Sequence, residues 1–242
     1  MMLRALPRAA AGIAASLALQ QTCQQSDDRL ARWRKRWEGD TRGWELGKTV
    51  HPRLYLISPR TLDPATFPDR LAEALSGGDV ACLMLDNPGL SEQDFQKLAE
   101  RVVPLAQKAG AAVVLRNDTR TAGRARADGV HLDTDGEEGA QDMERALETF
   151  RPDGIVGAGE IRSRHDAMTL AEIGVDYLLF GLLSLTPEAA PHDKTIQFAS
   201  WWSQLFETPC VALCGTDPAG VAACAATGAD FVALREAAWD HE

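Results

Sequence analysis

The sequence predicts a single (β/α)8 barrel preceded by a helical N-terminal extension. The chain of 242 residues has the length of one such barrel, which is typically about 250 residues. Short apolar runs recur after His51, and each is continuously apolar, as expected for strands buried on both faces of a parallel sheet. The segments between the runs carry the signals of helix starts and ends. This regular alternation favours a barrel built from repeated βα units.

The apolar runs define eight predicted strands. In chain order they are Leu54–Ile57, Ala81–Leu85, Ala111–Leu115, Val130–Leu132, Ile155–Ala158, Tyr177–Phe180, Cys210–Leu213 and Phe231–Leu234.

Polar residues mark where several helices between these strands begin. Ser91 precedes apolar residues at helical spacing, and Asp94 follows it at the position of a capping box. Ser163 is predicted to cap a second helix, which carries Met168, Leu170 and Ile173. Asp217 and Pro218 predict a third helix start, as N-cap and first helical residue.

Similar tripeptides lead into three of the strands. They are Ala127-Asp128-Gly129, Gly174-Val175-Asp176 and Gly228-Ala229-Asp230. Gly174 and Gly228 suit the left-handed residue that closes a helix. Only eight residues follow the last strand, so the final helix is predicted to be short or absent. A doubly wound open sheet is the alternative fold, but the chain contains neither nucleotide-binding glycine motif.

The N-terminal part differs from the rest in composition, and we assign residues 1–48 to the extension and residues 49–242 to the barrel. The extension is predicted to be helical or partly disordered. Ala9–Leu19 is too short for a membrane helix and lacks a clear cleavage site, which argues against secretion. Trp33 and Trp37 lie one helical turn apart and are predicted to dock onto the barrel, with a partner-binding helix as the alternative.

Composition limits the classes of partner. With 25 Lys+Arg and 35 Asp+Glu the formal net charge is −10, which argues against a dedicated nucleic-acid binder. No apolar run approaches the roughly 20 residues of a membrane helix, so no membrane partner is expected. The five cysteines are predicted to be free thiols in a reducing, cytoplasmic compartment. A homo-oligomer is left open.

The active site of such a barrel lies at the carboxyl ends of its strands. Polar residues that follow the predicted strands are Asp86, Asn87, Arg116, Asn117, Asp118, Asp133, Asp135, Glu160, Thr186, Thr216, Arg235 and Glu236.

Two groups among these residues favour particular chemistry. Asp118 follows one strand, and Asp133 and Asp135 follow the next. Carboxylates on adjacent strand ends can hold Mg²⁺, although Asp118 could instead cap the next helix and the other acids could be solvated loop residues. The backbone after Cys214 could cradle a phosphate, or it could form an ordinary strand-to-helix turn. His131 lies within an apolar strand and is predicted to be a hydrogen-bonded core residue rather than a base or a ligand.

One stretch resembles a known family. Arg116-Asn117-Asp118-Thr119-Arg120, followed by Ala127-Asp128-Gly129-Val130-His131-Leu132, resembles the thiamine phosphate synthase and thiazole tautomerase family. The resemblance runs from about Leu54 to Ala237 and includes Gly181 and the tripeptides described above. It implies a (β/α)8 barrel that joins hydroxymethylpyrimidine diphosphate to thiazole phosphate, with Mg²⁺ and release of pyrophosphate.

The resemblance also implies roles for individual residues. Asn117 would contact the diphosphate, and Asp118 and Asp135 would hold Mg²⁺. Thr186 would lie near the thiazole phosphate and Gly215 would offer a phosphate-binding backbone amide, while Lys194 could replace a loop lysine of the family. The partners would be small phosphorylated heterocycles, and no catalytic residue is assigned.

Some family motifs are changed in this sequence. The Q-x-R-x-K motif of the second strand is replaced by Cys82-Leu83-Met84-Leu85-Asp86, and G-x-S-x-H by Gly157-Ala158-Gly159-Glu160-Ile161. These changes remove charged groups where a diphosphate would bind. The alternative function is therefore a catalytically divergent barrel that binds a ligand or has a regulatory role, and a scaffold role of the extension is a third possibility.

Overall fold

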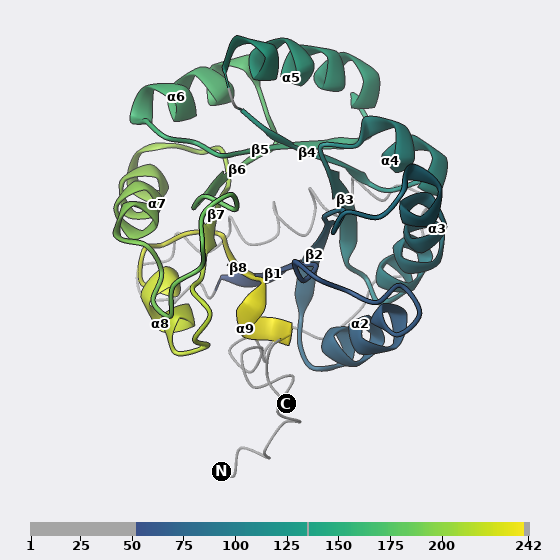
Figure 1. Ribbon diagram of the computed structural model, residues 1–242. Coiled ribbons are helices and arrows are strands. Elements are labelled where there is room, and N and C mark those ends of the chain that lie inside the picture. Colours follow the sequence, from purple (N-terminus) through teal and green to yellow (C-terminus); the bar gives the residue numbers. More distant parts are fainter. Residues whose placement is uncertain (1–51, 135, 240–242) are drawn as a thin grey trace.

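The computed structural model describes residues 52–134 and 136–239, and these form a closed barrel of eight parallel strands surrounded by helices (Figure 1). The strands are β1 (Arg53–Ile57), β2 (Val80–Leu85), β3 (Ala112–Arg116), β4 (Gly129–Asp133), β5 (Ile155–Gly159), β6 (Tyr177–Phe180), β7 (Cys210–Leu213) and β8 (Phe231–Leu234). The helices are α2 (Phe67–Ser76), α3 (Glu92–Lys108), α4 (Thr119–Ala125), α5 (Gly136–Phe150), α6 (Arg164–Ile173), α7 (Asp193–Leu205), α8 (Gly220–Ala225) and α9 (Glu236–Trp239).

All eight predicted strands are confirmed. Each pairs in parallel with its sequence neighbour, and β8 pairs with β1 to close the barrel. This closure excludes the doubly wound sheet. The predicted extension, residues 1–48, and its tryptophans lie outside the described residues, so the proposed boundary stays a prediction. In the described part of the chain, no helix is long and apolar enough to cross a membrane.

The strands are continuously apolar because both of their faces are buried. In β1, Leu54 and Leu56 belong to the cluster between the strands and the helices, whereas Tyr55 and Ile57 fill the interior of the barrel. Successive side chains of a strand point to opposite faces, so a barrel strand needs apolar residues at every position rather than at alternate ones.

The barrel interior contains a chain of polar side chains. The Tyr55 hydroxyl lies 2.7 Å from the Tyr177 hydroxyl, which lies 2.9 Å from His131 Nδ1. All three side chains are fully buried or nearly so. Burial lowers the pKa of His131 from 6.5 to about 4, so the imidazole is neutral near pH 7. The prediction of a hydrogen-bonded core histidine is confirmed.

At the amino ends of the strands, which we call the base, four aspartates occupy equivalent positions. Asp128, Asp176 and Asp230 each precede an even-numbered strand and accept a 2.8 Å hydrogen bond from the backbone N–H of Val113, Val156 or Cys210, at the start of the odd-numbered strand before it. Asp79 precedes β2 and pairs instead with the Arg53 side chain of β1. The base is thus built from repeated pairs of βα units.

Two of the three predicted helix starts are confirmed. Ser91 Oγ accepts from Asp94 N, and Ser163 forms a full capping box with Asp166. The start at Asp217-Pro218 is wrong, because α8 begins only at Gly220. Asp217 instead forms a turn in which its carboxylate accepts a hydrogen bond from Ala219 N. The backbone of this loop is hydrogen-bonded to the loop between β6 and α7.

The chain ends the barrel with a short helix, as predicted. Helix α9 lies beside α2, between the first and last βα units (Figure 1). Trp239 Nε1 donates a 2.6 Å hydrogen bond to the Ile57 carbonyl, and its ring packs against Phe67. Gly174 and Gly228 have the left-handed backbone that the sequence predicted.

Candidate active site at the mouth of the barrel

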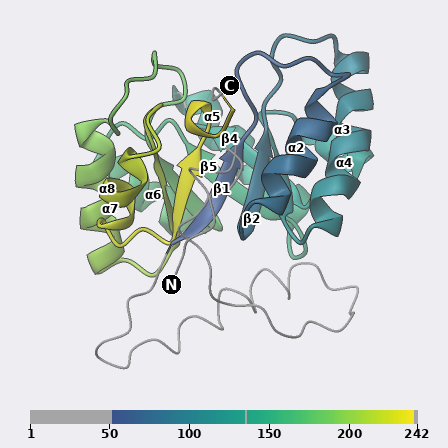
Figure 2. The same ribbon diagram turned by 90° about the horizontal axis from the view of Figure 1, so that it is seen from below.

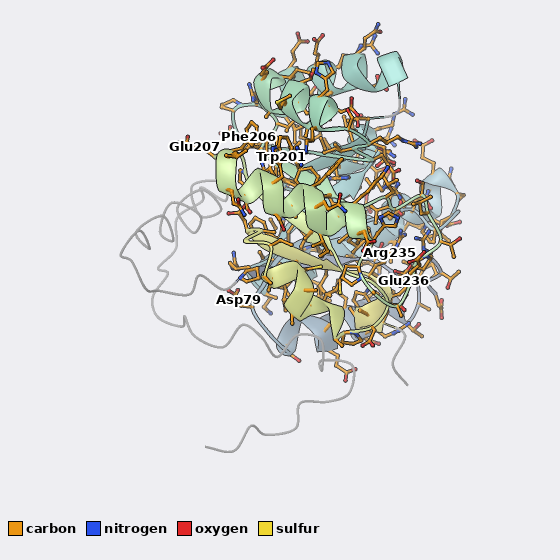
Figure 3. All side chains as sticks on the ribbon, turned by 90° about the vertical axis from the view of Figure 1, so that its left-hand side faces the viewer. Asp79, Trp201, Phe206, Glu207, Arg235 and Glu236 are labelled. Atoms are coloured by element: carbon orange, nitrogen blue, oxygen red, sulfur yellow. The ribbon has the colours of Figure 1, made fainter. Side chains whose placement is uncertain are left out.

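The carboxyl ends of the strands form the second end of the barrel, which we call the mouth. In Figure 3 the labelled Arg235 and Glu236 lie at this end, and Asp79 and Glu207 lie toward the opposite one. Figure 2 shows the strands side-on, with the loops after them on the side away from the base. Active sites of parallel βα barrels lie at this end.

Five charged side chains at the mouth form one connected group, which we call the mouth network: Asp86, Arg116, Asp133, Glu160 and Arg235. They come from the ends of β2, β3, β4, β5 and β8. Their two positive and three negative charges give a formal net charge of −1.

Arg116 is the centre of this network. Its guanidinium forms a bidentate pair with Asp133, with Nε–Oδ1 and Nη2–Oδ2 distances of 3.2 and 2.8 Å. Its Nη1 donates to Asp86 Oδ2 at 2.9 Å, and Glu160 lies 3.6 Å away. Burial alone would lower the pKa of Arg116. The hydrogen bonds and charges of Asp133 and Asp86 together outweigh burial and raise it.

Arg235 binds the same carboxylate oxygen from the other side. Its Nη2 donates to Asp86 Oδ2 at 2.7 Å and its Nε donates to the Ser58 carbonyl at 3.1 Å. The residue is only 4% exposed, and within the described part of the chain its Nη1 has no hydrogen-bond partner. Burial lowers the pKa of Arg235, and Asp86 offsets this only in part. The guanidinium nevertheless stays charged.

The two remaining acids are held by other groups of the mouth. Glu160 accepts from Ser184 N at 2.9 Å and from Ser184 Oγ at 2.6 Å, which ties β5 to the β6–α7 loop. Asp133 exchanges two hydrogen bonds with Asn117, whose Nδ2 donates to it at 2.7 Å and whose Oδ1 accepts from its backbone N at 2.9 Å. Both Asn117 and Glu160 have left-handed backbones, with φ of 54° and 55°. Such conformations outside glycine are uncommon and concentrate at functional sites.

The predicted site residues of the first half of the barrel take different positions. Asn117 joins the mouth network. Asp118 caps α4, its Oδ1 accepting from Thr121 N at 2.8 Å, which is the capping role the sequence left open. Its Oδ2 accepts no hydrogen bond from the described residues. Asp135, the other predicted metal ligand, lies outside them.

The predicted site residues of the second half lie on two loops that are bonded to each other. Thr186 is exposed on the β6–α7 loop, and Lys194 is exposed in the first turn of α7. Gly215 is buried where the β7–α8 loop passes under this loop, and a Cβ there would overlap the Ala189 carbonyl oxygen. Thr216 N and Asp217 N donate to the carbonyls of Glu188 and Ala189, so these two amides of the predicted cradle are engaged within the protein.

The described part of the chain does not by itself form a metal site. Within the described residues, no group of three His, Cys, Asp or Glu side chains could hold an ion. Asp118 nevertheless keeps one carboxylate oxygen for a ligand. Cys82, Cys210, Cys214 and Cys224 are free and buried, as predicted, and Cys23 lies outside the described residues.

Sequence reasoning placed Asp86, Arg116 and Arg235 among the polar strand ends but did not select them. One sequence feature could have drawn attention to Asp86, because it occupies a position where the resembled family has a cation. Its pairing with Arg235 could not be predicted, since the two residues are 149 positions apart in the chain.

Comparison with known proteins adds independent information. The family model described as "Thiamine monophosphate synthase" (TMP-TENI) matches residues 54–238. The thiamine-phosphate synthase of Rhodospirillum centenum is 35% identical over 192 residues, covering 78% of this chain and 90% of the relative. That of Hyphomonas neptunium is 34% identical over 196 residues, with coverage of 78% and 87%. The solved thiamine phosphate pyrophosphorylase of Pyrococcus furiosus superposes with a TM-score of 0.62 at 23% identity, over 76% of this chain and 86% of that one, which supports the fold.

Proposed function

This chain belongs to the thiamine monophosphate synthase family, and we propose that it joins hydroxymethylpyrimidine diphosphate to thiazole phosphate and releases pyrophosphate. The observation that carries the proposal is the family match over nearly the whole described barrel. The closed barrel and the polar mouth support it, because a transferase of this fold binds its substrates there.

The reaction requires that negative charge be stabilised on the departing group. The carbon–oxygen bond to the diphosphate breaks, and its electron pair leaves with pyrophosphate. Groups that bind the developing charge more strongly than the ground state accelerate such a step. Arg235, which is buried, and Arg116, which is partly buried, are cations at the mouth, and the Asn117 amide and the Arg116 guanidinium both donate to Asp133.

We also propose phosphate-binding roles for the residues that the family resemblance implies. Asn117 would contact the diphosphate, and Thr186, Lys194 and the Gly215 amide would contact the thiazole phosphate. Thr186 and Lys194 are both exposed toward solvent in the β6–α7 region, where a phosphate could reach them. Small phosphorylated heterocycles are therefore the proposed ligands, while the oligomeric state stays a prediction.

Mg²⁺ is the proposed cofactor. Asp118 and Asp135 would hold it, and the ion would neutralise part of the charge of a bound diphosphate. The free oxygen of Asp118 is compatible with this role. The cytoplasmic location also stays a proposal, and the free buried thiols support it because reduced cysteines are the rule there.

The proposal is tested by product formation. The full chain is incubated with both phosphorylated precursors and Mg²⁺, and thiamine phosphate is measured against a reaction without protein. We expect product that requires Mg²⁺ and that falls by about 10- to 100-fold in Asn117→Ala, the cost of one hydrogen bond to a charged group. The matched control is Arg145→Gln, which breaks an exposed ion pair with Asp142 on α5 and should retain activity. Absence of product beside a working synthase would overturn the proposal in favour of a divergent, ligand-binding barrel.

A further inference from the structure

One oxygen of the mouth network is shared by two arginines from distant parts of the chain. Asp86 Oδ2 accepts from Arg116 Nη1 at 2.9 Å and from Arg235 Nη2 at 2.7 Å. The two guanidiniums approach it from the ends of β3 and β8, on either side of β2. Guanidinium pairs that converge in this way are typical of sites that bind phosphate or carboxylate oxygens.

The two arginines differ in how completely they are paired. Arg116 has a bidentate partner in Asp133 besides Asp86. Arg235 has Asp86 as its hydrogen-bonded acid in the described structure, and its buried Nη1 makes no hydrogen bond there. A buried donor without a partner is costly. Arg235 is thus a buried cation with one hydrogen-bond donor left unsatisfied by the described residues.

Asp86 is the least firmly held acid of the network. Glu160 is fixed by Ser184, and Asp133 is fixed by Arg116 and Asn117. The carboxylate of Asp86 uses one oxygen only, and its Oδ1 accepts no hydrogen bond from the described residues. Its side chain is 17% exposed, as is that of Asp133, against 1% for Glu160. Asp86 can therefore turn away from the arginines at a lower cost than the other two acids.

We propose that Asp86 occupies the place of a ligand oxygen, and that a phosphate or diphosphate group binds Arg235 and Arg116 by displacing the Asp86 carboxylate. Such a group offers several oxygens where Asp86 offers one, so it can meet both Nη atoms of Arg235 in a bidentate pair. Asp86 then acts as an internal competitor. It is paired with both arginines in the free protein, so a ligand must carry enough negative charge to replace it.

The identification of the ligand as a substrate diphosphate rests on the proposed function, but the anion site does not. The site is therefore tested by binding alone, with inorganic pyrophosphate as the probe. Calorimetric titration of the full chain is carried out at fixed, low ionic strength, because surface charges are screened by salt. The variants are Asp86→Asn, Arg235→Gln and the exposed control Arg145→Gln.

The proposal predicts opposite signs for the two mouth variants. Asp86→Asn removes the competing charge and keeps the shape, so pyrophosphate should bind about tenfold more tightly. Arg235→Gln removes the guanidinium that would bind the anion, so pyrophosphate binding should weaken by at least about tenfold. Arg145→Gln should bind like the wild type. Unchanged or weaker binding by Asp86→Asn would show that Asp86 merely holds the arginines in place and would overturn the proposal.

Two further measurements keep the outcome interpretable. If Arg235→Gln does not fold, Arg235→Lys replaces it, and loss of the bidentate fork should still weaken pyrophosphate binding. Wild-type binding equal to that of Arg235→Lys would contradict the assignment. Product formation is measured separately in the wild type: an inactive protein with the predicted binding pattern refutes the synthase function alone, and an active protein whose Asp86→Asn variant binds no more tightly refutes the anion site alone.

Discussion

The two ends of this barrel use carboxylates in opposite ways. At the base, Asp128, Asp176 and Asp230 accept hydrogen bonds from the backbone of a neighbouring strand. At the mouth, Asp86 and Asp133 pair with the partly buried Arg116, and Asp86 also pairs with the buried Arg235. These three base acids accept from neutral backbone N–H groups, although Asp79 at the base pairs with Arg53, whereas the mouth acids pair with cations that a ligand could bind in their place. Stabilisation of the fold and ligand binding thus fall to different ends of the barrel, as in other βα barrels.

The comparison also concerns distance along the chain. The base contacts join residues 15 to 20 positions apart, within one pair of βα units. The mouth contact between Asp86 and Arg235 spans 149 positions. The base contacts, like the mouth contact between Arg116 and Asp133 at 17 positions, can form locally during folding, but the contact between Asp86 and Arg235 exists only once the barrel is closed.

The largest effect is expected at the base, where a side chain on β4 would collide with the backbone of β5. A Cβ at Gly129 would overlap the carbonyl oxygen of Ile155, and a backbone atom cannot move aside cheaply. Gly129→Ala should therefore lower the free energy of unfolding by more than about 4 kcal/mol, measured by urea denaturation. Gly123→Ala is the matched control, because a Cβ there meets nothing within 4 Å. It lies inside α4 and should stabilise by up to about 1 kcal/mol; equal stabilities of the two variants would refute the close approach.

The second effect separates acid sensitivity of the interior from that of either end. The folded state keeps His131 neutral down to about pH 4, whereas the unfolded chain protonates it near 6.5. Unfolded chains therefore bind more protons between these values, and stability should fall as the pH is lowered from 6.5 to 4. A difference of this size corresponds to roughly 3 kcal/mol.

Denaturation of the wild type and His131→Gln at pH 7 and pH 4.5 checks this prediction. The variant should lose less stability on acidification than the wild type. His165→Gln changes an exposed histidine and should keep the wild-type difference. If His131→Gln is as acid-sensitive as the wild type, the carboxylates of the two ends cause the effect instead.

The third effect sharpens the division of roles between the ends. Asp176→Ala leaves the buried Val156 N–H without its acceptor, so we expect a loss of about 1–3 kcal/mol in stability. Pyrophosphate binding at the mouth should be unchanged by calorimetry at a temperature where the variant is folded. A change in pyrophosphate binding would show that the two ends are coupled and would contradict their separate roles.

The smallest effect is expected for an exposed pair at the mouth. Arg60 pairs with Glu236 at 2.7 Å and donates to the Leu185 carbonyl, yet its side chain is 38% exposed. Ion pairs in contact with solvent contribute little, so Arg60→Ala should cost less than about 1 kcal/mol in a thermal or urea melt. Lys97→Ala, which breaks a more exposed pair on α3, should cost less still. A loss above about 2 kcal/mol for Arg60→Ala would show that this contact contributes substantially to the stability of the mouth.

Much of the fold was accessible to sequence reasoning because its determinants are local. The eight strands are continuously apolar, and the caps at Ser91 and Ser163 depend on residues three positions away. The helix start at Asp217-Pro218 was wrong for the opposite reason. Contacts of this loop with the carbonyls of Glu188 and Ala189, which belong to another βα unit, hold it in a turn and delay α8 to Gly220.

The candidate site divides along the same line. Asn117 and Asp118 were identified from a short motif, and each lies beside a partner in or next to its own βα unit. The pairing of Asp86 with Arg235 was not identified, because no pattern in either segment points to the other.

The sequence alone determined the number, order and burial of the strands, the polar residues at their ends and the family resemblance, since periodicity and short motifs act within a few turns of chain. Only the tertiary structure decided which charges share one oxygen. Pairing of β1 with β8 brings the last strand end next to the first ones, and the resulting contact depends on the closed circle rather than on any stretch of residues.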